Sequence, residues 1–150
     1  MNDRYLYRAK RTDNGEWVDG YLFDDGFENG RMFVGGLVIE EYHGTASDDW
    51  SITGVDFYEV DQFTICQCTS LKDKNGKLIW ENDICRRILL PTKRIEKNFR
   101  IAYVPYKCCL SAIDLDGSNI TFLSDYINNQ YEVEVIGSAI DNQELLEVGE

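Results

Sequence analysis

The 150-residue sequence has few of the residues on which most enzyme chemistry depends. It contains a single histidine, His43, and histidine is the side chain most often recruited for acid–base catalysis. No Gly-x-Ser-x-Gly nucleophile motif and no glycine-rich phosphate loop before a helix takes its place. We therefore expect a non-enzymatic protein, with His43 in a long mobile loop over residues 41–50. Catalysis by His43 and the acids around it stays open as an alternative.

Long apolar runs are also missing. No window approaches the roughly 20 apolar residues that a membrane span requires, and the N-terminus MNDRYLYRAKR has no signal-peptide core. These absences predict a cytoplasmic protein without a membrane partner. Only two prolines interrupt a composition that is 43% apolar and 13% aromatic, which favours a packed globular fold over disorder.

The five cysteines lack the spacing of a zinc site or of a disulfide framework. They occur as Cys66-x-Cys68, Cys85 and Cys108-Cys109, and we interpret them as reduced, packing residues, with zinc left open because ligands can be distant in sequence. Calcium is disfavoured as well: when Gly76 is aligned with position six of an EF-hand loop, Leu71 and Asn82 occupy two essential ligand positions. No metal, cofactor or small-molecule substrate is predicted.

Positive charge is scarce and unevenly placed, with 15 Lys and Arg against 27 Asp and Glu. Thirteen acids lie between Thr12 and Leu71 against Arg31 alone, and nine acids follow Lys107 without any Lys or Arg. Between these acidic regions lies a basic segment, residues 86–107, with seven cations and only Glu96 opposing them. Six of the cations are candidate partner-binding residues: Arg86, Arg87, Lys93, Arg94, Lys97 and Arg100. A solvated hairpin loop over 89–98 is the structural alternative.

Turn signals at short intervals separate brief runs rich in Val, Ile, Tyr, Phe and Trp, as in an all-β protein. The signals include Asn14-Gly15, Gly35-Gly36, Thr53-Gly54, Asn75-Gly76 and Asp116-Gly117. The spacing predicts hairpins of 4–8 with 16–23 and of 109–115 with 119–123, separate short strands at 31–34 and 36–39, and strands at 98–104 and 131–138. Short helices are expected at 123–128 and 142–148.

The run Thr64–Ile84, TICQCTSLKDKNGKLIWENDI, resembles the signature of the YopX family of phage and prophage proteins. Tyr7–Lys10 with the following Gly15–Gly20 resembles the opening of that family, and Glu134–Ser138 with a later Asn-x-Glu-Leu-Leu resembles its ending. Cys66, Ser70 and Asn82 replace usual glycines. The first two would be strained wherever a positive φ is needed, whereas Asn82 can adopt one at modest cost.

The resemblance implies a phage or prophage context and a C-terminal SH3-like barrel, and it implies no assigned activity. It also marks a set of signature residues with an expected structural role: Asp73, Asn75, Gly76, Ile79, Asp83 and Gly137. We predict a mainly β protein with an N-terminal β-rich lobe, residues 1–65, and an SH3-like small barrel with a short tail, residues 66–150. Its expected role is an accessory interaction module that binds a protein, with self-association as one form. The alternatives are nucleic-acid binding by segment 86–107 and an acidic DNA mimic that inhibits a host enzyme.

Overall fold

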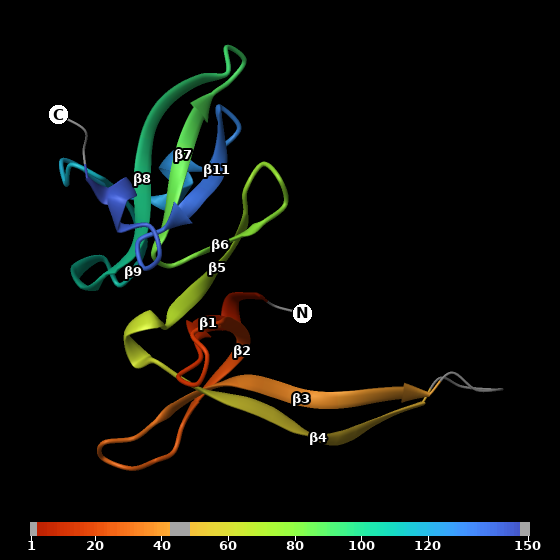
Figure 1. Cartoon of the computed structure of the whole chain (residues 1–150). Coiled ribbons are helices and arrows are strands. Elements are labelled where there is room, and N and C mark those ends of the chain that lie inside the picture. The colour runs from red at the N-terminus through yellow and green to blue at the C-terminus, as the bar shows by residue number, and fades with distance from the viewer. Residues whose placement is uncertain (1–2, 43–48, 148–150) are drawn as a thin grey trace. The chain divides into compact units, whose positions relative to one another are not determined.

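A computed structural model describes residues 3–42 and 49–147 (Figure 1). The mainly β prediction is confirmed, since strands make up most of the described chain and the one α-helix in it, α1, spans only Leu123–Tyr126. The chain divides into two compact units, an N-terminal unit of residues 5–66 and a C-terminal unit of residues 67–150 together with residues 1–4.

In the N-terminal unit, four antiparallel strands follow each other in the order β4-β3-β2-β1. They are β1 (Tyr7–Lys10), β2 (Trp17–Asp24), β3 (Met32–Tyr42) and β4 (Asp49–Val60). The predicted first hairpin is present, with Gly15 at a φ of 72° in its turn, but its first strand is Tyr7–Lys10 and not residues 4–8, since Asp3–Tyr5 forms a short helix. Val60 bridges back to Arg11, so the end of β4 is held beside the end of β1. The short helix η2 (Gln62–Thr64) follows β4.

Residues 31–39 were expected as two short strands with a turn at Gly35-Gly36, and this expectation is wrong. β3 is continuous through both glycines, and Thr53-Gly54 likewise lies inside β4. A Cβ at Gly35 would lie only 1.9 Å from the backbone oxygen of Asp56, so glycine here permits close strand packing and makes no turn. The expected mobile loop falls mostly on residues 43–48, outside the described residues.

β3 and β4 extend well beyond the end of β2 as a two-stranded ribbon (Figure 1). β2 pairs with β3 only from Met32 to Gly35, whereas β4 pairs with β3 as far as Tyr42. The small core of this unit lies under the shared part of the sheet and is centred on Ala9, Val34 and Val60.

The C-terminal unit contains a hairpin of β5 (Cys66–Lys72) and β6 (Leu78–Trp80) and a five-stranded sheet in the order β10-β9-β8-β7-β11. The sheet strands are β7 (Asp83–Leu89), β8 (Arg94–Val104), β9 (Cys109–Asp114), β10 (Ile120–Phe122) and β11 (Tyr131–Ser138). The predicted hairpin around Asp116-Gly117 and the closing strand are confirmed. The loop expected over 89–98 is shorter, because β7 continues to Leu89 and β8 begins at Arg94.

The SH3-like barrel is not confirmed: in the described part of the chain β10 and β11 are the two edges of an open sheet. The core beneath it contains Ile79, Cys85, Phe99, Ile101 and Val133, with the ring of Tyr126 packed edge-on against Phe99 at 4.8 Å. Phe99 and Ile101 alternate along β8 and are fully buried, whereas Tyr103, the next residue in this alternation, is half-exposed. The remaining short helices of the unit are η1 (Asp3–Tyr5), η3 (Pro105–Lys107) and η4 (Gln143–Leu146).

Candidate protein-interaction surfaces

Most of the cations in segment 86–107 form ion pairs within the C-terminal unit. Lys93 lies 2.7 Å from Glu132 of β11, and Lys97 lies 2.8 Å from Asp114 of β9. The two pairs are separated by 39 and 17 residues in sequence, and antiparallel strand pairing brings each acid close to its cation. The charge surplus counted along the sequence is therefore partly compensated in the folded chain.

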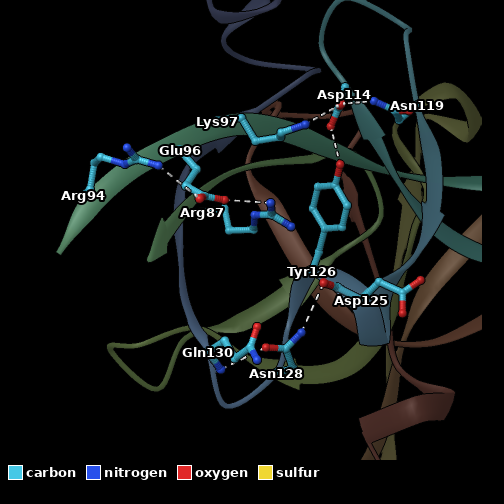
Figure 2. Close-up of polar contacts among 10 residues, drawn as sticks. All are labelled: Arg87, Arg94, Glu96, Lys97, Asp114, Asn119, Asp125, Tyr126, Asn128 and Gln130. Carbon is cyan, nitrogen blue, oxygen red and sulfur yellow. Dashed lines mark hydrogen bonds and ion pairs between the residues drawn. The ribbon is translucent and has the colours of Figure 1, made fainter. Parts of the chain in front are cut away.

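Glu96 joins two further cations of the segment, as Figure 2 shows. It is the extra residue at a bulge between β7 and β8, because Arg87 pairs with Lys97 while Ile88 pairs with Ile95. Its carboxylate lies 2.7 Å from Arg87 and 3.6 Å from Arg94.

Arg87 is almost wholly enclosed. Its guanidinium lies 4.5 Å from the ring centre of Tyr126 and 4.1 Å from that of Tyr131, a cation–π arrangement that adds to the ion pair with Glu96. With 13% of its side chain exposed, Arg87 is part of the packing of the sheet. It is not available as a surface contact.

Arg86 and Arg100 are half-buried on strands of the same sheet. Arg86 lies opposite Glu134 in β11 and Asn98 in β8, and Arg100 lies opposite Ile84 and Ile113. Lys107 stacks over the ring of Phe122 at 4.3 Å. Among the cations of this segment, only Lys93 and Arg94, at the β7–β8 turn, have largely exposed side chains.

Asp114, at the end of β9, is the centre of the most connected polar cluster in Figure 2. Its carboxylate accepts hydrogen bonds from Lys97 Nζ (2.8 Å), Tyr126 Oη (2.5 Å) and Asn119 Nδ2 (2.9 Å), with Ser118 Oγ at 3.4 Å. Three of these donors share Oδ2 and Tyr126 alone donates to Oδ1, so both carboxylate oxygens have partners within the same chain.

Burial would raise the pKa of Asp114, but the hydrogen bonds from Lys97, Tyr126 and Asn119 outweigh it and hold the pKa below its usual value. The hydrogen bond to Asp114 is the main cause that raises the pKa of Lys97. The pKa of Tyr126 is also raised, first by burial and second by its hydrogen bond to Asp114. A cavity of about 370 Å³ borders Lys97 and Asp114. Because their charged groups are paired with each other, the cluster reads as structural.

The signature turn is built around the Asp73 carboxylate. Oδ1 accepts from the backbone N–H groups of Asn75 and Lys77, and Oδ2 accepts from that of Val135 in β11. Burial opposes these bonds, yet they keep the pKa of Asp73 below its usual value. Gly76 has a φ of 81° in the turn, so the motif closes a hairpin and ties it to β11.

The other signature residues also lie at structural positions. Ile79 is fully buried, and Asp83, buried at the start of β7, accepts a hydrogen bond from the backbone N–H of Trp80 at 2.8 Å. Gly137 lies at a β-bulge where a Cβ would be 2.7 Å from Leu145 Cδ1. Ser70 and Asn82 have φ angles of 64° and 65°, so two of the three replaced glycines fall at left-handed positions, and Cys66 does not.

A surface that sequence reasoning missed lies on β2, β3 and β4. On these strands, residues that pair across the ladder point to the same face of the sheet, and alternate residues point to opposite faces. Leu37 pairs with Val55, Ile39 with Ile52, and Gly35 with both Tyr21 and Phe57. The face they share is opposite to the one that carries the core residue Val34.

We name this surface the apolar face and define it by its exposed large side chains: Tyr21, Phe23, Leu37, Ile39, Ile52 and Val55. Their exposed fractions range from 39% for Tyr21 to 61% for Val55. Half-buried Phe57 packs edge-on against Phe23 with ring centres 4.7 Å apart and extends the surface. The sequence holds part of this signal, because Val55 and Phe57 flank Asp56, but the assumed turns at Gly35-Gly36 and Thr53-Gly54 concealed the strands.

The remaining predictions about chemistry concern His43, the cysteines and membranes. His43 lies outside the described residues. Within residues 3–42 and 49–147, no group of three or more His, Cys, Asp or Glu side chains could hold a metal ion, and no helix has the length and apolarity to cross a membrane. Cys66, Cys68 and Cys85 are buried, and Cys108 is exposed.

Comparison with known proteins identifies the family of the chain. A search of curated proteins finds no match to the chain. A family model described as YopX protein matches residues 6–147, nearly the whole length. The matched range includes the Asp73 turn, the left-handed positions 70 and 82, and the Gly137 bulge. The chain therefore belongs to the YopX family.

Proposed function

We propose that this YopX-family chain is a phage or prophage accessory protein that works as a non-enzymatic protein-interaction module in the cytoplasm of its bacterial host. The apolar face on β2, β3 and β4 is its binding surface. The observation behind the proposal is that six large apolar side chains gather, exposed, on one face of a sheet. Contiguous exposed apolar surface of this kind usually marks a protein-binding site.

The arrangement of charge supports a protein partner. On β3 and β4, the paired positions of the apolar face between Phe33–Glu59 at one end and Glu41–Trp50 at the other carry no Asp, Glu, Lys or Arg, and Asp19 of β2 lies at the edge of this face, two residues before Tyr21. Interface centres are typically depleted of charge and enriched in aromatic residues, with charged groups at the rim. Nucleic acid requires cations beside its phosphates, so this face suits protein.

Segment 86–107 is the basis of the alternative, nucleic-acid binding. Lys93 and Arg94 are the largely exposed cations there, and Lys93 is paired with Glu132 and Arg94 with Glu96. A salt-dependent retention of DNA or RNA that is lost in Lys93→Ala/Arg94→Ala would favour this alternative. Arg87 is unsuitable for that test, because its replacement would remove packing between Tyr126 and Tyr131.

Two finer proposals complete this view. The C-terminal unit is an opened form of the SH3-like barrel, supported by the bonds from Lys74 N to Val133 O and from Val135 N to Asp73, which connect the β5–β6 turn to β11. The acidic DNA mimic remains a proposal as well, supported by the run of thirteen acids against one arginine between Thr12 and Leu71.

The test compares tagged wild-type chain with three variants in capture from host lysate, followed by reconstitution with the purified partner. Ile39→Thr/Val55→Thr alters the apolar face and keeps β-branched residues, and Val38→Thr is a matched control one residue away on the opposite side of β3. Lys93→Ala/Arg94→Ala tests the basic segment.

Binding that is lost only in Ile39→Thr/Val55→Thr supports the proposal. Equal binding by all variants overturns the assignment of this face. Loss of partner binding only in Lys93→Ala/Arg94→Ala would show that the basic segment is the binding surface.

A further inference from the structure

We infer that the partner on the apolar face is a second copy of this chain, stacked face to face through β2, β3 and β4. This inference rests on the proposed function and names the occupant of the same surface. The paired residues Leu37–Val55 and Ile39–Ile52 form its centre. Homodimers with two-fold symmetry use the same patch on both copies, so the patch must be compatible with itself.

The size of the apolar face fits a dimer. Side chains of this kind have accessible areas on the order of 200 Å² and are about half exposed here, so the six present roughly 600 Å² per copy. Two copies would bury about 1,200 Å², which is the lower end of stable interfaces. A patch of this area is at the upper end of what monomers expose, where such patches are often functional.

Charge determines which association is possible. Two copies with a net charge of −12 each repel one another, and an interface between them must keep acids away from its centre. The apolar face does so, because its paired positions from Gly35–Phe57 to Ile39–Ile52 carry no charge. A partner recognised through complementary charge would instead be expected to meet acids at the centre.

The sign of the salt dependence separates this dimer from one held by charge. Salt screens the repulsion between acidic copies, with a Debye length of about 10 Å at 0.1 M, and does not weaken apolar contact. The dimer should therefore strengthen between 50 and 500 mM NaCl. A dimer in which segment 86–107 meets acidic surface of its neighbour should weaken over the same range.

Sedimentation velocity of the full-length chain from 5 to 200 µM, at both salt concentrations, provides the test. We expect a monomer–dimer equilibrium that strengthens with salt. Its dissociation constant should increase at least about 100-fold in Ile39→Thr/Val55→Thr and stay within about 3-fold in Val38→Thr. Far-UV circular dichroism of the variants establishes that each is folded.

A wild-type monomer at 200 µM in both salts overturns the inference, and so does a dimer that weakens with salt or that Ile39→Thr/Val55→Thr leaves intact. The proposed function fails separately, when the face variant captures the same partners as wild type. A monomeric chain whose partner is lost in the face variant would overturn the dimer and retain the binding surface.

Discussion

Replacing Asp114 with Asn should destabilise the C-terminal unit more than any other single acid-to-amide change near it. The substitution keeps the shape of the side chain and removes the charge to which Lys97, Tyr126 and Asn119 donate. Asp114 is 5% exposed, so water cannot replace the lost contacts. The new amide also presents its own N–H groups to donors that need an acceptor.

Hydrogen bonds to a charged group are each worth about 1.5–3 kcal/mol, and breaking a buried ion pair costs about 3–5 kcal/mol. Lys97 is partly exposed and recovers hydration, which reduces its share. We therefore expect a loss of about 3 kcal/mol in the free energy of unfolding. Asp116→Asn, two residues away on an exposed turn, should leave the free energy of unfolding nearly unchanged, because an Asn Oδ1 can still accept the hydrogen bond from the Ser118 N–H.

The assay is urea unfolding read by hydrogen-exchange mass spectrometry of peptides from β8 and β9, so that the signal belongs to the C-terminal unit. Because the folded pKa of Asp114 is below its unfolded value, the unfolded chain binds protons first as pH falls. The contribution of the Asp114 charge to the free energy of unfolding is therefore complete above the unfolded pKa of about 4 and is lost below it. The difference in free energy of unfolding between wild type and Asp114→Asn should narrow at those lower pH values. A cost under about 1 kcal/mol, or a gap that does not change in acid, would refute the reasoning.

Three other changes test separate features. Ser70→Gly should raise the free energy of unfolding by about 0.5–1 kcal/mol in urea titrations. Glycine adopts the left-handed φ of this position without strain, and the larger conformational entropy of glycine in the unfolded chain offsets part of that gain. A decrease would contradict this. Gly137→Ala should cost about 1–2 kcal/mol, since its Cβ would displace Asn142 Oδ1 from the Ser138 N–H, and unchanged hydrogen exchange over 138–146 would argue against it. At pH 8, iodoacetamide should label exposed Cys108 at least about 100-fold faster than Cys85, whose pKa is raised mainly by burial, and comparable rates would show that Cys85 is accessible.

Local signals in the sequence predicted the turns well where a backbone conformation depends on one or two residues. Asn75-Gly76, Asn14-Gly15 and Asp116-Gly117 form turns in which the glycine takes a positive φ. Gly35-Gly36 misled for a related reason, because glycine is used both for turns and for close approach of strands, and only the neighbouring Asp56 backbone distinguishes the two.

The candidate binding segment could not be judged from the sequence, because its partners are remote. Lys93 meets Glu132 and Lys97 meets Asp114, separations of 39 and 17 residues that strand pairing closes. In the sequence Arg87 resembles a surface cation, but in the structure the rings of Tyr126 and Tyr131 enclose it. The apolar face was hidden for the same reason, since it exists only when residues of three strands are aligned in register.

The alternation along β3 has an evolutionary consequence. Val34 belongs to the core of the N-terminal unit, whereas Leu37 and Ile39 are on the opposite side of the same strand. Substitutions at Leu37 and Ile39 can therefore change the proposed binding surface while the folding core is left intact. A lineage under pressure to alter its partner could vary those positions without first acquiring a compensating gain in stability.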